Sequence, residues 1–159
     1  MVVWRIAKKA YALDRVGIGA MLEGGRWNTA NVPVIYAGMT IEIASFEKLV
    51  HVMSVLPKDL VLVNITMPNN EAIYYKVQMD DLPVNWNALP SSAAAQEFGN
   101  QFIQDNQYLG MIVPSVVIPE ARNIVINPNH PQWANCTMSI ERDFVYDARL
   151  AKIPKKTEA

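Results

Sequence analysis

The sequence predicts an α+β fold, with one domain over residues 1–159, a mixed central sheet and flanking helices. Two observations favour this class. Short apolar segments typical of strands are mixed with helical segments without the regular alternation of a doubly wound α/β sheet. The chain has 159 residues, 51% hydrophobic and 18% charged, which is typical of one globular domain with a single core.

The first half of the chain is predicted to form three strands, at residues 2–6, 33–37 and 60–65. The third is apolar on both faces, as a central strand requires. Between the first two strands, residues 7–14 are expected to start a helix. The glycines at 17, 19, 24 and 25 are then expected to form a loop.

A helix is predicted from Thr40, a suitable N-cap, to about Ser54. Its apolar side chains recur at helical spacing and are Ile43, Phe46, Val50 and Met53. Glu47 lies at the margin of this apolar face. Because an unpaired buried carboxylate is costly, Glu47 must reach solvent or meet a partner such as Arg26. The pattern leaves open a structural ion pair or an active-site acid.

The second half of the chain is predicted to add a helix and further strands. Pro90-Ser91-Ser92 opens a helix whose body is 93–103. The apolar segment 111–118 contains Pro114, which cannot donate to a sheet, so this segment is an edge, a bulge or a bend. The remaining strands are expected at 73–77, after a turn at 68–71, and at 123–127 and 139–147.

The segment Gly24-Gly25-Arg26-Trp27-Asn28 most clearly predicts a binding site. Its glycines let the backbone approach a ligand closely, Arg26 offers a fork of donors for an anion, and Trp27 offers a stacking surface. The alternative is a surface arginine whose stem lies over Trp27. Tyr36 closes an otherwise apolar strand, and is either a half-buried core tyrosine or a site residue.

Polar residues in the later strands allow two interpretations. Ser115 follows Pro114, and is either a serine that bonds its own backbone at a bend or a site residue. Asn123 and Asn127 bracket three apolar residues, a place where asparagine commonly forms turns.

Composition and motifs disfavour several classes of function. The net charge of −1 gives no basic excess for nucleic acid and no charge asymmetry for a membrane surface. His51 and His130 have no second ligand at metal-binding spacing. The sequence contains no phosphate-binding loop, no dinucleotide glycine fingerprint and no nucleophile elbow.

Cysteine usage and the chain ends favour a cytoplasmic protein. The single Cys136 excludes an internal disulfide framework and fits a reducing compartment. No signal peptide is visible, and no stretch approaches the ~20 apolar residues that span a bilayer. The basic run within 152–159 is expected to be a solvated C-terminal tail.

Six segments, taken in order, resemble the RES domain family and cover nearly the whole chain. They are Gly24–Asn28, Val34-Ile35-Tyr36, Ala44-Ser45-Phe46-Glu47, Val113-Pro114-Ser115, Asn123–Pro131 and Phe144–Leu150. The resemblance implies the toxin half of a bacterial toxin–antitoxin pair, with a fold similar to that of ADP-ribosyltransferase toxins. It also implies NAD as the substrate, no metal, and an antitoxin partner with an Xre-type helix-turn-helix domain.

The resemblance further implies which residues form the site. The expected catalytic residues are Arg26, Tyr36, Glu47 and Ser115. The expected NAD contacts are Arg5, Gly25, Arg26, Trp27, Asn28, Tyr36 and Asn127.

Three hypotheses about function follow, and the motif residues serve the first two equally. The first is cleavage of the nicotinamide–ribosyl bond of NAD, with water or inorganic phosphate as the acceptor. The second is transfer of ADP-ribose to a cellular protein. The third is a non-catalytic binding subunit that acts only through its partner. The sequence identifies no surface for a homodimer.

Overall fold

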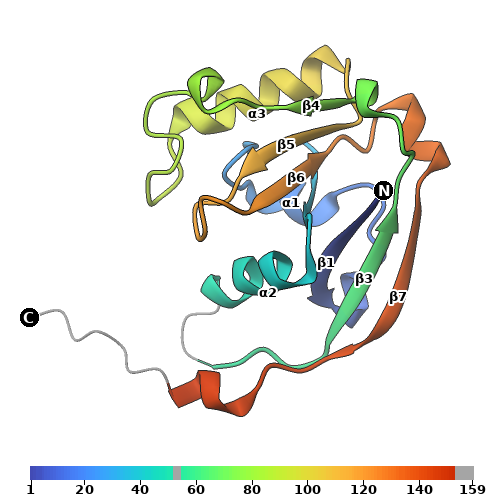
Figure 1. Ribbon diagram of the computed structural model, residues 1–159, viewed down its shortest axis with the longest axis vertical. Helices are drawn as coiled ribbons and strands as arrows, with labels where there is room; N and C mark the ends of the chain where they lie inside the picture. The colour runs from blue at the N-terminus through green and yellow to red at the C-terminus, as the bar shows by residue number, and fades with distance from the viewer. Residues whose placement is uncertain (52–54, 153–159) are drawn as a thin grey trace, which may run out of the picture.

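The chain folds around one mixed, seven-stranded sheet, drawn in Figure 1 from a computed structural model that describes residues 1–51 and 55–152. The strands, in their order across the sheet, are β4 (Tyr74–Lys76), β5 (Gly110–Pro114), β6 (Arg122–Ile126), β2 (Ile35–Gly38), β1 (Val2–Lys8), β3 (Leu60–Thr66) and β7 (Thr137–Phe144). Neighbouring strands are antiparallel except β4 and β5, which are parallel. The predicted α+β class with a mixed sheet is confirmed.

Helices accompany this sheet in the described part of the chain. The α-helices are α1 (Ile18–Glu23), α2 (Ile41–Val50) and α3 (Ala93–Asp105), and short 3₁₀ turns occupy Lys9–Tyr11, Glu71–Ile73, Met79–Asp81, Pro131–Asn135 and Ala148–Lys152. Helix α2 contacts β1, β2 and β6. Figure 1 shows α2 between the β5–β6 pair and the β1–β3–β7 strands, whereas α3 runs beside β4. The sheet therefore carries α2 close to its middle strands.

The predicted helix starts are confirmed by their capping bonds. The Thr40 hydroxyl oxygen accepts a hydrogen bond from the Ile43 amide at 3.3 Å, and the Ser92 hydroxyl oxygen accepts one from the Ala95 amide at 3.1 Å. Both caps satisfy amides that the first helical turn leaves without a partner. Helix α2 ends at Val50, and the predicted end at Ser54 lies outside the described residues.

The helix predicted over residues 7–14 is wrong. Strand β1 continues to Lys8, which pairs with Leu60 of β3, and a single 3₁₀ turn follows at Lys9–Tyr11. Pairing with a strand more than fifty residues away overrides the local preference here.

The apolar face predicted for α2 is also only partly correct. Ile43 is buried, but Phe46 is 44% exposed and Val50 is 55% exposed, while Met53 lies outside the described residues. Ala44 is the buried neighbour of Ile43, because the helix turns this small residue toward the sheet. Glu47, three residues after Ala44, lies on the same side of the helix.

The two faces of the middle strands carry different residues. Tyr36 of β2, Val125 of β6 and Met111 of β5 are paired across the sheet and pack with Trp27 and α3. The next positions point to the opposite face and join a second core with Trp133 and Cys136. Strand β3 is buried on both faces between β1 and β7, as its sequence predicts.

Cys136 is expected to be an unreactive thiol. It is buried, and burial raises its pKa to about 11, so the thiolate is scarce near neutral pH. A thiol-reactive dye at pH 8 should therefore label the folded protein slowly and the denatured protein fast. Rapid labelling of the folded protein would contradict this burial.

No helix in the described residues is both long and apolar enough to cross a membrane. The C-terminal tail predicted from residue 152 lies outside the described residues beyond Lys152 itself.

Candidate active site

Close contact between α2 and the sheet brings Glu47 over the middle strands. A Cβ atom at Gly38 would lie 2.7 Å from the Ala44 backbone nitrogen, so only glycine allows α2 to approach β2 this closely. Gly38 pairs with Asn123 on β6, the neighbouring strand. Because Glu47 follows Ala44 by less than one helical turn, its side chain reaches the strands beyond Gly38.

Two side-chain donors hold one carboxylate oxygen of Glu47. The Ser115 hydroxyl donates to Glu47 Oε1 at 2.7 Å, and the Asn123 amide donates to the same oxygen at 2.6 Å. Ser115 stands directly after β5 and Asn123 lies in β6, so adjacent strands of the sheet supply the two donors. Glu47 therefore meets a partner, as its position at the margin of the apolar face requires, but its bonded partners are neutral donors and not Arg26.

Ser115 makes local and distant contacts at the same time. Its fully buried hydroxyl oxygen accepts from the Val117 and Ile118 amides at 3.0 and 3.1 Å, and its proton goes to Glu47. The chain therefore bends after Pro114, one of the predicted outcomes. The local bonds hold the serine so that it can orient the carboxylate.

Tyr36 forms two hydrogen bonds with the segment Gly24–Asn28. The Tyr36 hydroxyl donates to Asn28 Oδ1 at 2.6 Å and accepts from the Trp27 amide at 3.0 Å. A Cβ atom at Gly25 would lie 2.8 Å from this hydroxyl, so Gly25 makes room for Tyr36. Burial raises the pKa of Tyr36, which keeps the phenol protonated and able to donate.

The side chain of Asn28 is bonded to the backbone of its own loop and of α1. It is fully buried, and its Nδ2 donates to the carbonyl oxygens of Ala20, Thr29 and Val32 at 2.8, 3.2 and 3.0 Å. An amide with this many partners fixes the loop backbone. The predicted contact of Asn28 with NAD stays a prediction.

Helix α3 fastens the same loop from the other side. The Gln96 amide donates to the Gly25 carbonyl at 3.1 Å, and Asn100 both accepts from the Thr29 amide and donates to the Thr29 hydroxyl. Neither Gln96 nor Asn100 is distinguishable in sequence from an ordinary polar residue of an exposed helix face.

Trp27 lies in the core rather than on an open surface. Its side chain is 3% exposed, its ring is stacked 6.1 Å from that of Trp86, and Phe98 lies 6.0 Å away. The indole thus supports the loop from inside, and its predicted contact with NAD stays a prediction.

Arg26 is turned toward the loop that precedes α3. Its Nη1 donates to the carbonyl oxygens of Trp86 and Ala88, both at 2.8 Å. Burial lowers the pKa of Arg26, and the nearby negative charge of Glu47 opposes this shift. In the described residues the remaining guanidinium nitrogens make no hydrogen bond, so this arginine keeps donors for an anion.

Within the described chain Arg5 has an unpartnered donor, whereas both polar atoms of the Asn127 side chain are bonded to other residues. Arg5 is largely buried, burial lowers its pKa, and its Nη1 has no hydrogen-bond partner among the described residues. Asn127 lies past the opposite end of β6 from Asn123, about 13 Å along the strand. Its Nδ2 donates to Asn106 at 2.8 Å, and its Oδ1 accepts from the Asn129 amide at 2.9 Å. The structure thus does not bring Asn127 to Glu47.

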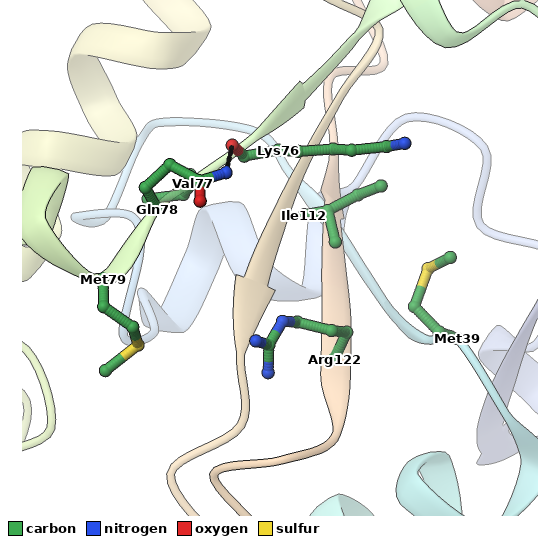
Figure 2. A pocket seen from close by; sticks show the side chains of 7 residues that line it. All are labelled: Met39, Lys76, Val77, Gln78, Met79, Ile112 and Arg122. Carbon is green, nitrogen blue, oxygen red and sulfur yellow. Dashed lines mark hydrogen bonds between the residues drawn. The ribbon is translucent and has the colours of Figure 1, made fainter.

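A cavity of about 440 Å³ lies elsewhere on the protein (Figure 2). Its lining residues are Met39, Lys76, Val77, Gln78, Met79, Ile112 and Arg122. Ile112 and Arg122 precede Val113 and Asn123 by one residue each, so their side chains point to the opposite face of the sheet. This cavity is therefore separate from the cluster of Glu47, Ser115 and Asn123, where the polar groups converge.

Within residues 1–51 and 55–152, no cluster of three or more His, Cys, Asp or Glu side chains could hold a metal ion.

Comparison with known proteins shows the family of this chain. The family model described as "RES domain" matches residues 2–147. The chain belongs to the RES domain family. The family assignment predicted from six short motifs is thereby confirmed over nearly the whole chain.

Curated relatives of this RES domain protein are named as toxins. It is 36% identical over 154 residues to the "Prs ADP-ribosylating toxin" of Sphingobium sp. strain YBL2, covering 94% of this chain and 96% of that protein. It is 32% identical over 158 residues to "Toxin Res" of Photorhabdus laumondii, covering 98% and 100%.

A solved structure shares the fold of this RES domain protein. One chain of the M. tuberculosis MbcT–MbcA toxin–antitoxin complex superposes with a TM-score of 0.58 at 16% identity, covering 95% of this chain and 86% of that chain. This likeness shows the architecture alone.

Proposed function

We propose that this protein is the toxin of a bacterial toxin–antitoxin pair and that it consumes NAD by cleaving the nicotinamide–ribosyl bond. The carboxylate of Glu47, held by Ser115 and Asn123 with the charge of Arg26 nearby, is the observation that carries this proposal. The relatives named as toxins support it.

The chemistry needs a fixed negative charge more than a metal. When the bond between the ribose C1′ and the nicotinamide nitrogen breaks, its electron pair leaves with nicotinamide and the ribosyl carbon becomes oxocarbenium-like. A carboxylate already oriented beside that carbon stabilises the developing positive charge. Water or inorganic phosphate then forms the new bond to C1′, and a water acceptor loses its proton to solvent. Glu47 is the residue that we assign to this stabilisation.

The other site residues bind and orient the dinucleotide. The Nη1 atom of Arg26 is bonded to two carbonyl oxygens. Its other guanidinium donors bind the pyrophosphate or a ribose oxygen. Tyr36 offers its ring face to nicotinamide. Arg5 is a second anion contact, supported by its buried and unpartnered Nη1. Gly25, Trp27, Asn28 and Asn127 complete the predicted contacts.

Transfer of ADP-ribose to a cellular protein is the second candidate function. It is favoured by the name of the Sphingobium relative, an ADP-ribosylating toxin at 36% identity. The same bond of NAD breaks in both reactions, and Glu47 stabilises the same developing charge. Only the acceptor differs.

Product analysis separates the two candidates. We expect purified protein with NAD labelled in its adenylate half to release free ADP-ribose, or ADP-ribose with phosphate on the same ribosyl carbon when phosphate is added. Label that accumulates on a protein band of a bacterial lysate, with little free product, would favour transfer. If neither product forms, both candidates are wrong.

The partner belongs to this proposal as well. A protein that depletes NAD must be inhibited in its own cell, so we propose an antitoxin with an Xre-type helix-turn-helix domain, and a cytoplasmic location for both. A neighbouring gene for such a protein would support this, and co-expression should restore growth. Failure of co-expression to restore growth would contradict the pairing.

A homodimer of the toxin is a separate possibility, and measurement of the mass of the purified toxin in solution tests for it.

A further inference from the structure

The amide of Asn123 is oriented by the chemistry of its neighbour. A carboxylate only accepts hydrogen bonds, so the atom of Asn123 that lies 2.6 Å from Glu47 Oε1 must be the donating Nδ2. This fixes the opposite atom, Oδ1, on the far side of the amide. The reversed amide would bring two acceptors together.

The orientation leaves Asn123 Oδ1 in an unfavourable place. This oxygen is buried and has no hydrogen-bond partner among the described residues. An acceptor in this state lowers stability, because its bonds to water are lost without replacement. A fully apolar side chain would avoid that cost. The unpartnered Oδ1 therefore offsets much of the stability that the bond from Asn123 to Glu47 provides.

The second carboxylate oxygen of Glu47 differs from the first. Ser115 and Asn123 both donate to Oε1, whereas Oε2 makes no hydrogen bond within the described chain. Two donors on one oxygen define the rotation of the carboxylate about its last bond. One donor leaves this rotation less restricted.

We propose that Asn123 is a positioning residue, which acts with Ser115 on Glu47 Oε1 so that Oε2 is presented to the ribosyl carbon of the substrate. This inference rests on the proposed function and deepens it. Cross-strand pairing of Asn123 with Gly38 makes the arrangement possible, because the glycine lets α2 come within reach of the amide.

The test compares Asn123→Leu with Asn64→Leu, a matched change on β3. Asn64 is bonded to the Thr66 hydroxyl and belongs to the same sheet. Loss of a hydrogen bond to a charged group should lower kcat for NAD consumption roughly ten- to hundredfold in Asn123→Leu, with little change in KM. Its thermal unfolding midpoint should stay close to that of wild type, because removal of the unpartnered oxygen offsets loss of the bond to Glu47. Asn64→Leu should keep the wild-type kcat.

The outcomes distinguish this inference from the proposed function. A wild-type protein that acts on NAD together with an Asn123→Leu variant of unchanged kcat overturns the inference alone. A wild-type protein that neither cleaves NAD nor transfers ADP-ribose overturns both. If Asn123→Leu does not fold, Asn123→Thr, whose hydroxyl is too short to reach Oε1, should show the same loss of kcat.

Discussion

Replacement of Glu47 by glutamine is expected to lower NAD consumption by about 10²–10³-fold while the protein stays folded. Glutamine keeps an amide oxygen in the place of Oε1, so Ser115 and Asn123 retain their acceptor. The negative charge near the ribosyl carbon is lost, and with it the stabilisation of the oxocarbenium-like state. The measurement is NAD consumption by purified protein, together with thermal unfolding and growth inhibition on expression.

Glu42→Gln is the matched control for this change. Glu42 lies five residues earlier on α2 and is exposed, where it interacts with the helix N-terminus. It should keep full NAD consumption and growth inhibition. Unchanged NAD consumption by Glu47→Gln would remove the carboxylate from the mechanism. Growth inhibition by a wild-type protein that consumes no NAD would instead favour the non-catalytic binding subunit.

Local sequence signals predict the elements that depend on local physics. The caps at Thr40 and Ser92 are bonds between residues three positions apart, so the sequence displays both partners together. Strand β3 is predictable because its apolar residues bury both of its faces. The helix predicted at residues 7–14 does not form, because the end of β1 is determined by its pairing with the distant strand β3.

The candidate site is less accessible to sequence reasoning, because its contacts join distant segments. The position of Glu47 at the margin of an apolar face predicts that it needs a partner. The partners, Ser115 and Asn123, stand 68 and 76 residues away and meet Glu47 only because β6 lies beside β2 and β5 lies beside β6. Asn123 is also interpreted as a turn former, since asparagine at the end of a strand has both uses.

The loop Gly24–Asn28 shows the same limit in another way. The sequence places an arginine beside an indole, but only the fold decides which of them faces outward. Trp27 turns into the core against Trp86, and Arg26 keeps donors available. The glycines are required by neighbouring protein atoms as much as by any ligand, as the contact of Gly25 with Tyr36 indicates.

Gly99→Ala is expected to destabilise the protein and to disturb the site from a distance. A Cβ atom at Gly99 of α3 would lie 1.9 Å from the Trp27 carbonyl oxygen, and a backbone atom cannot move aside as a flexible side chain can. Alanine favours a helix over glycine by up to about 1 kcal/mol, but overpacking of this kind costs roughly 1–3 kcal/mol or more. The unfolding midpoint should fall by roughly 3–10 °C.

The same change should also lower NAD consumption, because the displaced segment is the one that carries Arg26. Gly19→Ala is the matched control, since a Cβ atom at this position in α1 meets no other atom within 4 Å. Its midpoint should equal or exceed that of wild type, as the gain in helix preference is not opposed. If Gly99→Ala unfolds at the wild-type midpoint, α3 does not hold the Arg26 loop rigidly. If its midpoint falls but the folded protein keeps full activity, the position of Arg26 tolerates the displacement, and its role in binding NAD is weaker than we propose.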